Sequence, residues 1–479
     1  MSYFVVDKKI DEIKEVLNES SDFSSRLFKT SSQTIGMAFL KSMTDANLLS
    51  EAILQPLQCF DKPFTIDAIK EEILQIGEIE EIKEEDIVEK ILNGRVVFVT
   101  DFSDKILAID ICFYPTRIPS EPPTSPVIQG PREGFVEDIL TNITLIRRRL
   151  KTDKLVMKQL KVGRLSQTNI IVTYLKGVAN QDIVEKVITK LNKIDADGIL
   201  DSYYILSYLQ ERPHSIFKQI GNSEKPDIVS SKLLEGKVAI IVDNSPIVLT
   251  IPFALIEDLH NSNDYYTNHH YSSMVRVIRL LGLFVAIIAP GFYLSLQIYH
   301  YNILPINFLI TIADTTKGLP FTPFLEILFI FLLFQILYEV SLRLPSYLGL
   351  ATSIVGALIL GDTGVKAGLI SPPGVIIIAL SKIALYTIPE QASQITIMQL
   401  IFIMLGGCLG IFGVICGSIY FILYFNSIDS YDTPYLVPYA PRIREDLSDG
   451  ILTGTTKELE GVPLSFKGGK KKREKENVE

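Results

Sequence analysis

Three charged side chains, those of Glu339, Asp362 and Lys366, lie in or beside long apolar stretches of the sequence. An Asp or Lys left unpaired near the centre of a membrane helix costs at least ~2.5 kcal/mol, so such residues usually face a helix-bundle interior or an aqueous path. We therefore predict that the three residues contribute to an ion path or its gate. The alternative places Glu339 and Lys366 at the headgroup level, with the lysine amine extended toward water. Asp362 suits that alternative less well because its side chain is short.

The sequence contains none of the common catalytic or cofactor-binding motifs. We find no P-loop, GxSxG, HExxH or dinucleotide-binding pattern. The five histidines and four cysteines show neither metal-ligand spacing nor a CxxC pair. The net charge of −9, without a basic face, argues against a nucleic-acid partner. We therefore expect no enzymatic activity, no metal and no cofactor.

A short run rich in glycine and proline precedes a predicted helix. It contains Gly130, Pro131, Arg132 and Gly134, and the N-terminus of a helix after such a loop can bind an anion. A structural turn that opens the helix explains the run more simply, so we regard the four residues as candidates for a hinge between subdomains. The arginines 147–149 of the same helix could contact anionic lipid, but we expect them to pair with nearby carboxylates.

Composition divides the chain into a charged first part, an apolar second part and a polar end. We predict a first soluble subdomain over residues 1–114, a proline-rich linker over 115–131 and a second soluble subdomain over 132–275. A membrane domain over 276–426 and a basic cytoplasmic tail over 427–479 follow. The expected fold is an α+β soluble region of two small α/β subdomains, followed by an all-α polytopic membrane domain.

Apolar periodicity and turn residues predict the elements of the soluble part. Helical spacing occurs in residues 1–60 and in the acidic stretch 65–92. Two further helices are expected over residues 133–150 and 180–191, the latter with Asn180 as its N-cap. Short β-branched or alternating runs predict strands at 95–100, 108–114 and 169–174, one beginning at 199, and a hairpin of 237–243 with 247–251.

Five apolar stretches follow the soluble part, and a membrane span needs ~20 mostly apolar residues. Arg276 and Arg279 mark the cytoplasmic side of the first stretch, whereas the loop 387–393 has no lysine or arginine and suits the outside. The start of the chain lacks a secretory signal. With both ends inside, we predict four crossings and a third stretch that re-enters from the cytoplasmic side, and six crossings stay open. The stretches are 277–299, 323–340, 348–370, 374–388 and 397–425.

Other residues interrupt these apolar stretches. The second stretch carries Glu326 as well as Glu339, and the fourth carries Lys382. The fifth contains glycines with small-xxx-small spacing, which lets helices approach closely. Packing within one chain explains these glycines better than a dedicated oligomer contact. They are residues 406, 407, 410, 413 and 417.

A series of short motifs runs along the chain in a fixed order. The motifs are Ile128–Glu137, Leu145–Arg149, Leu234–Asp243, Asp264–Tyr266, Arg343–Pro345, Ser353–Leu358 and Val365–Pro372. Together they resemble the A-type subunit of bacterial spore germinant receptors, the GerA family, over about residues 90–425. One departure is Lys218, which stands where the family typically has a proline.

The resemblance implies a membrane receptor. In that family the A subunit works in the inner membrane of the dormant spore with a transporter-like B-type subunit and a lipoprotein C-type subunit. It is thought to oligomerise around an ion path that opens when nutrient binds. The implied protein is thus the A subunit of a nutrient germinant receptor, a homo-oligomer in a lipid membrane with its soluble domain and tail in the cytoplasm. The alternatives are a component of a secondary transporter and a non-conducting signalling scaffold.

Overall fold

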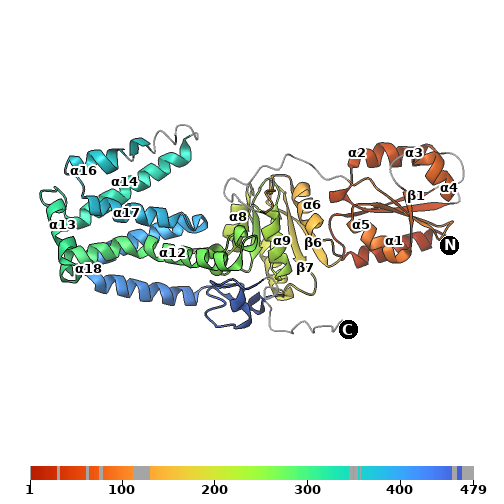
Figure 1. Cartoon of the computed structure of the whole chain (residues 1–479). Helices are drawn as coiled ribbons and strands as arrows, with labels where there is room; N and C mark the ends of the chain where they lie inside the picture. Colours follow the sequence, from red (N-terminus) through yellow and green to blue (C-terminus); the bar gives the residue numbers. More distant parts are fainter. Residues whose placement is uncertain are drawn as a thin grey trace.

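Figure 1 shows an elongated molecule with three parts in a row: the first soluble subdomain, the second, and the helices of the membrane half. The C-terminal segment, whose described residues are 428–455 and 461–466, is drawn in dark blue and lies beside the second subdomain. Part of the predicted proline-rich linker, residues 115–129, and the basic run 470–473 lie outside the described residues. This computed structural model describes residues 2–29, 33–60, 64–74, 79–112, 130–344, 349, 354–356, 358–455 and 461–466.

The first subdomain is a five-stranded antiparallel sheet in the order β1-β2-β4-β5-β3, with helices on both faces. The strands are β1 (Phe23–Lys29), β2 (Thr34–Leu40), β3 (Ile79–Ile82), β4 (Val96–Thr100) and β5 (Ile106–Ile109). The helical elements are α1 (Ser2–Val16), η1 (Lys41–Met43), α2 (Ala46–Leu48), η2 (Leu49–Leu54), α3 (Gln55–Cys59), α4 (Ile66–Ala68), η3 (Ile69–Ile73), η4 (Glu84–Asp86) and α5 (Ile87–Leu92). β4 and β5 confirm the predicted strand pair, but β5 begins at Ile106 and ends at Ile109, earlier than predicted, and residues 113 and 114 of the predicted strand lie outside the described residues.

Three strands of this sheet lie where the sequence predicted helix. β1 and β2 fall within residues 1–60 and β3 within 65–92, so the helical prediction is wrong for these segments. β2 is buried along its whole length and therefore lacks the alternation of a half-exposed strand. Glu80 and Glu81 of β3 form ion pairs with Lys90 and Lys70, among others, and such pairs stabilise an acidic sequence as an edge strand.

The second subdomain is also a five-stranded antiparallel sheet, in the order β6-β7-β9-β10-β8. α7 and α8 pack on one face and α6 and α9 on the other. The strands are β6 (Leu155–Val162), β7 (Thr168–Leu175), β8 (Gly221–Ser223), β9 (Val238–Val242) and β10 (Val248–Ile251). The helices are α6 (Ile139–Arg149), α7 (Gln181–Asn192), α8 (Ser202–Leu209) and α9 (Pro226–Leu234). The two sheets and the membrane helices confirm the predicted fold class.

Local signals account for most of this subdomain. The Asn180 side chain caps α7 by accepting from the backbone N–H of Asp182, as predicted. The predicted hairpin is confirmed by β9 and β10. The strand expected at Ile199 is wrong, because Asp201 caps α8 there and Ile199 packs into the core from a loop. α6 begins later than predicted, after its N-cap Asp138.

A buried ion pair joins the two soluble subdomains. The Arg147 guanidinium lies 3.1 Å from the Asp22 carboxylate, and both side chains are almost completely buried. Arg148 and Arg149 lie within 4 Å of Glu133, at 3.7 and 2.7 Å. The prediction that this arginine run pairs with carboxylates is therefore confirmed.

Three helices among the described residues are long and apolar enough to cross a membrane: α12 (His269–Ile298), α14 (Pro323–Arg343) and α18 (Ala392–Ser427). α17 (Pro372–Leu385) is apolar but shorter. Gly282 lies beside Thr387 and Tyr293 packs near Ile327, so α14 and α17 run antiparallel to α12. The other elements of this part are α10 (Ile256–Leu259), α11 (Ser262–Tyr265), η5 (Tyr301–Ile303), α13 (Ile306–Thr316), η6 (Leu358–Thr363), α16 (Gly364–Lys366), η7 (Pro389–Gln391), β11 (Asp429–Ser430), β12 (Thr433–Pro434), η8 (Glu445–Ser448) and η9 (Leu464–Phe466).

α18 is a helical hairpin rather than one straight helix. Gly410 has φ of 63° and ψ of −150°, which breaks the helix. The rings of Phe402 and Phe421 stack with centroids 5.7 Å apart, whereas 19 residues of straight helix would separate them by about 28 Å. Gly406 touches the backbone of Gly291 in α12, which confirms that the glycine run packs within the chain.

Both ends of the α18 hairpin lie at the soluble domain. Gln391 donates to Asp258 over 2.9 Å, and Phe425 packs edge-on against Phe217 at 4.6 Å between centroids. The loop 387–393 therefore lies on the side of the soluble domain, and its expected outside position is wrong. The lack of lysine and arginine in this loop gave the wrong side, because contacts with the soluble domain determine where the loop lies.

The described part of the third apolar stretch runs along α14. Gly356 lies beside Leu337, toward the soluble-domain end of α14, and Ile370 packs in a cluster with Ile327 near its other end. η6 and α16 connect these two levels. The predicted re-entrant segment lies partly outside the described ranges, which omit residues 345–348, 350–353 and 357.

Candidate functional site

The predicted ion-path residues form two local pairs. Asp362 and Lys366 lie 2.8 Å apart across one turn of η6 and α16, with their side chains 53% and 75% exposed. Glu339 pairs with Arg343 at 2.6 Å in the last turn of α14, and both side chains are exposed. Each pair has helical i,i+4 spacing. The structure therefore brings Asp362 and Lys366 together and leaves Glu339 in a separate pair at the soluble-domain end of α14.

Two other charged residues are buried among the membrane helices. The Glu326 carboxylate accepts from the backbone N–H of Ser371 over 2.7 Å. The Lys382 amine lies 3.3 Å from Gln335 Oε1 and 4.5 Å from the centroid of the Phe331 ring. Their places inside apolar stretches are the sequence signal that marks both residues. Both interactions fix helix packing, because each joins α14 to α17 or its N-terminal cap.

A charged cluster lies where the soluble domain meets α12, and we call it the junction. Asp264 of α11 binds two arginines of α12, Arg276 at 3.2 Å and Arg279 at 2.6 Å. Burial would raise the pKa of Asp264, but hydrogen bonds and charge from these arginines hold it below its usual value. The arginines that marked the cytoplasmic side in the sequence thus tie the first membrane helix to the soluble domain.

The C-terminal segment closes the junction from another side. Arg276 also donates to Asp449 and to the Gly450 carbonyl, each over 2.8 Å. The Tyr265 hydroxyl donates to Asp449 over 2.9 Å, and His260 Nε2 lies 3.2 Å from the Gly450 carbonyl. Burial lowers the pKa of His260 to about 4, so the imidazole is neutral at pH 7.

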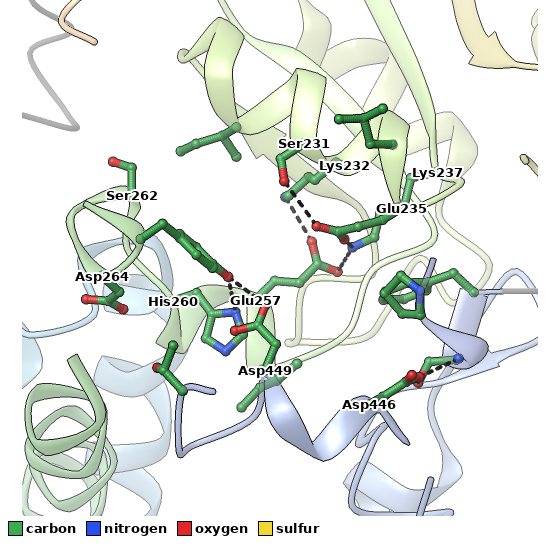
Figure 2. A pocket seen from close by; sticks show the side chains of 18 of the residues that line it. Ser231, Lys232, Glu235, Lys237, Glu257, His260, Ser262, Asp264, Asp446 and Asp449 are labelled. Atoms are coloured by element: carbon green, nitrogen blue, oxygen red, sulfur yellow. Dashed lines mark hydrogen bonds and ion pairs between the residues drawn. The ribbon is translucent and has the colours of Figure 1, made fainter. Parts of the chain in front are cut away.

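A second charged group lies beside the junction, in the groove that Figure 2 shows. Glu257 of α10 lies 2.8 Å from Lys232 Nζ and 2.7 Å from Lys237 Nζ. Burial alone would raise the pKa of Glu257. The two ammonium groups outweigh this effect of burial and hold the pKa at about 2. The groove has a volume of about 1990 Å³ and is bordered by the second subdomain, α10, α11 and the C-terminal segment. Phe466 of that segment stacks under Lys237 at 4.0 Å.

Lys218, the departure from the family pattern, lies beside the contact between the soluble domain and α18. Its amine lies 3.1 Å from the Asp258 carboxylate, and both side chains are nearly buried. Asp258 accepts from Gln391 as well, at the start of α18. A proline at position 218 would remove the first of these contacts. Lys218 therefore adds an ion pair within the soluble domain, to the carboxylate that also contacts the start of α18, and a proline would lack this pair.

The four hinge candidates lie in a non-helical segment that leads into α6. Gly130 has φ of 111°, and a Cβ there would lie 2.6 Å from the Tyr266 ring of the junction. Glu133, between Arg132 and Gly134, forms the ion pairs with the arginines of α6. The structure thus places Gly130 against the junction, and a hinge role for this segment stays a prediction.

The comparisons with known proteins agree on one family. The family model described as Bacillus/Clostridium GerA spore germination protein matches residues 11–463. The chain is 32% identical to spore germination protein KA of Bacillus subtilis (strain 168), over 93% of this chain and 83% of that protein. It is 31% identical to spore germination protein GerQA of Bacillus cereus, over 93% and 90%. The chain belongs to the GerA spore germination family.

Among solved structures, the chain is similar to the N-terminal domain of the A subunit of the Bacillus megaterium spore germinant receptor GerK3. The sequence identity is 27% and the TM-score is 0.39. The match covers 50% of this chain and 91% of the crystallised one. Family membership and the three long apolar helices together make this chain a membrane protein with the role of a germinant receptor subunit.

Proposed function

We propose that this chain is the A subunit of a nutrient germinant receptor and that several copies surround an ion path lined in part by η6 and α16. The observation that carries the proposal is the exposed Asp362–Lys366 pair. Val365, which lies between these two residues in the sequence, packs in one cluster with Ile327 of α14, so the pair lies in the membrane half, toward the end of α14 that is remote from the soluble domain. Charges beside the apolar surface of membrane helices are costly when they face lipid.

The exposed pair therefore calls for protein or water on that face. Within the described residues of one chain, each of the two side chains is held mainly by the other. A second copy of the chain packed at η6 and α16 would shield the pair from lipid. A ring of copies would turn the charges toward a central aqueous path, in which rings of acidic and basic side chains select ions.

The course of the helices supports six passes through the membrane. α12 leaves the soluble domain, α14 returns, residues 354–356 and 358–371 leave again, and α17 returns to the soluble domain. The two halves of the α18 hairpin supply the fifth and sixth passes. An even number keeps the soluble domain and the C-terminal segment on one side, which we propose is the cytoplasmic side of the spore inner membrane.

The junction supports a coupling role for the soluble domain. Asp264, Arg276 and Asp449 join α11, α12 and the C-terminal segment in one connected set of ion pairs. A movement of the second subdomain would therefore be passed to the first membrane helix. We propose that B-type and C-type subunits act on this domain and that the chain itself performs no catalysis.

The test is conductance of the purified full-length chain in planar bilayers, alone and with its B-type and C-type partners. Asp362→Asn and Lys366→Gln should lower the conductance or change its ion selectivity. Glu12→Gln is the matched control, because Glu12 and Lys8 form an exposed i,i+4 pair in α1, outside the membrane half.

Each other outcome points to a different function. Wild-type conductance and selectivity in both membrane variants would reject the assignment of η6 and α16 to the ion path. A complete complex that never conducts would favour the signalling scaffold. Nutrient uptake into liposomes by this chain alone would favour the secondary transporter. The break in α18 at Gly410 also resembles the discontinuous helices of such transporters.

A further inference from the structure

The outer face of α8 exposes large side chains that the core does not use. Ile205 and Leu209 point into the second subdomain and are fully buried. Away from this buried stripe, Tyr203 is 69% exposed, and Tyr204 and Tyr208 on a flank of the helix are also exposed. Tyr204 and Tyr208 are four residues apart and therefore lie on one stripe of the helix. Together with Leu200, three tyrosines thus form an exposed face that we call the tyrosine face.

The C-terminal end of α8 is fastened to the end of the last membrane helix. The Arg212 guanidinium donates to the Ser427 hydroxyl over 3.1 Å. The Tyr431 hydroxyl donates to the Leu209 carbonyl over 2.9 Å. In Figure 1, α8 lies on the side of the second subdomain that faces the membrane helices. The tyrosine face is therefore held close to the C-terminal end of α18, where the last membrane helix ends.

Other tyrosines mark that level. Tyr338 and Tyr386 lie at the soluble-domain ends of α14 and α17, with ring centroids 6.1 Å apart. Tyr420 and Tyr424 stack at 6.2 Å near the end of α18. Tyrosine is enriched where a membrane protein crosses the headgroup region, because its ring is apolar and its hydroxyl is polar. The tyrosine face continues this belt beyond the membrane helices.

We propose that the tyrosine face of α8 rests on the headgroup region of the bilayer and docks the second subdomain onto the membrane. The contact depends on tyrosine and leucine rather than on basic residues. The nearby Arg164 is paired with Asp195 at 3.3 Å and with Asp197 at 2.9 Å. The docking is therefore expected to tolerate high salt, unlike contacts made by polybasic segments.

The absence of tryptophan from the chain gives a direct test. Tyr204→Trp and Tyr208→Trp each introduce one fluorophore into the full-length protein, which is reconstituted in liposomes with and without lipids brominated near the headgroup. Leu140→Trp is the control within the same subdomain, because Leu140 is exposed on α6, on the other face of the sheet. Ile419→Trp, exposed on α18, is the positive control.

We expect brominated lipid to quench both α8 variants, at 0.1 M and at 1 M salt, while Leu140→Trp keeps its fluorescence. Quenching of the α8 variants no stronger than that of Leu140→Trp would overturn the proposal. A change in the fluorescence of the α8 variants that appears only at a high ratio of protein to lipid, without quenching by bromine, would also overturn the proposal. That result would assign the tyrosine face to a contact with a second copy of the chain. Neither result depends on whether the complex conducts ions.

Discussion

Replacing Glu257 by glutamine tests how the groove beside the junction is held together. The substitution keeps the shape of the side chain and removes the charge that two buried ammonium groups share, at 2.8 Å from Lys232 and 2.7 Å from Lys237. Breaking a buried ion pair by removing one partner costs about 3–5 kcal/mol. The pKa of Glu257 gives a second route to the magnitude. It is about 2 in the folded chain against an ordinary 4.5, a difference worth about 3 kcal/mol.

The pH dependence of this effect has a defined sign. A carboxyl group whose pKa is lowered by folding stabilises the folded chain above its unfolded pKa, and this stabilisation is lost as the pH falls through the folded value. The difference in stability between wild type and Glu257→Gln should therefore be full at pH 7 and shrink between pH 4.5 and pH 2. The measurement is urea unfolding of the full-length protein in detergent, followed by far-ultraviolet circular dichroism across this pH range.

The control for this experiment is Glu12→Gln, which removes an exposed ion pair with Lys8 at 3.6 Å. Exposed pairs of this kind contribute about 0–1 kcal/mol. If Glu257→Gln destabilises the protein no more than Glu12→Gln, the reasoning is refuted. A large loss that stays constant down to pH 2 would refute the electrostatic cause and leave packing as the explanation.

Three further predictions concern other contacts. Asp22→Asn should cost about 3 kcal/mol by leaving Arg147 buried without its charge partner, measured as faster limited proteolysis between the soluble subdomains. Gly406→Leu should lower the melting temperature in detergent, because its side chain would meet the backbone of α12, whereas Gly361→Leu, with nothing within 4 Å, should not. Because burial lowers the pKa of His260 to about 4, the neutral ring stabilises the fold fully above pH 6.5 and less as the pH falls toward 4. Protease release of the C-terminal segment should rise by up to tenfold per pH unit over that range, and a glutamine at this position should abolish the rise.

The sequence predicts those elements whose signals are local. Asn180 marked the start of α7 because a cap needs only its own helix, and β9 with β10 follow from a short turn between two apolar runs. β2 escaped prediction because both of its faces are covered by helices from other parts of the chain. The break in α18 escaped it too, since five glycines occupy that helix and only the backbone of Gly410 shows which of them reverses it.

The candidate site divides in the same way. Asp362 and Lys366 were found because a charge in an apolar stretch is visible in the sequence, and their pairing across one turn follows from helical spacing. The junction was not found, because its partners are far apart in the sequence. Arg276 and Asp449, for example, meet only through the folded path of the C-terminal segment. No local pattern distinguishes Asp449 from any other acidic residue near the end of the chain.

The reversal at Gly410 has a consequence for how the protein enters the membrane during synthesis. The 36 residues of α18 include no Asp, Glu, Lys or Arg, and the turn itself consists of Leu409, Gly410 and Ile411. No charged loop therefore has to be carried across the bilayer, which is the step that costs most in the insertion of a helical pair. Each half is about 27 Å long, close to the thickness of the hydrocarbon core. In the orientation proposed above, the whole hairpin partitions into lipid as one unit from the cytoplasmic side, and the segment that follows it stays on that side.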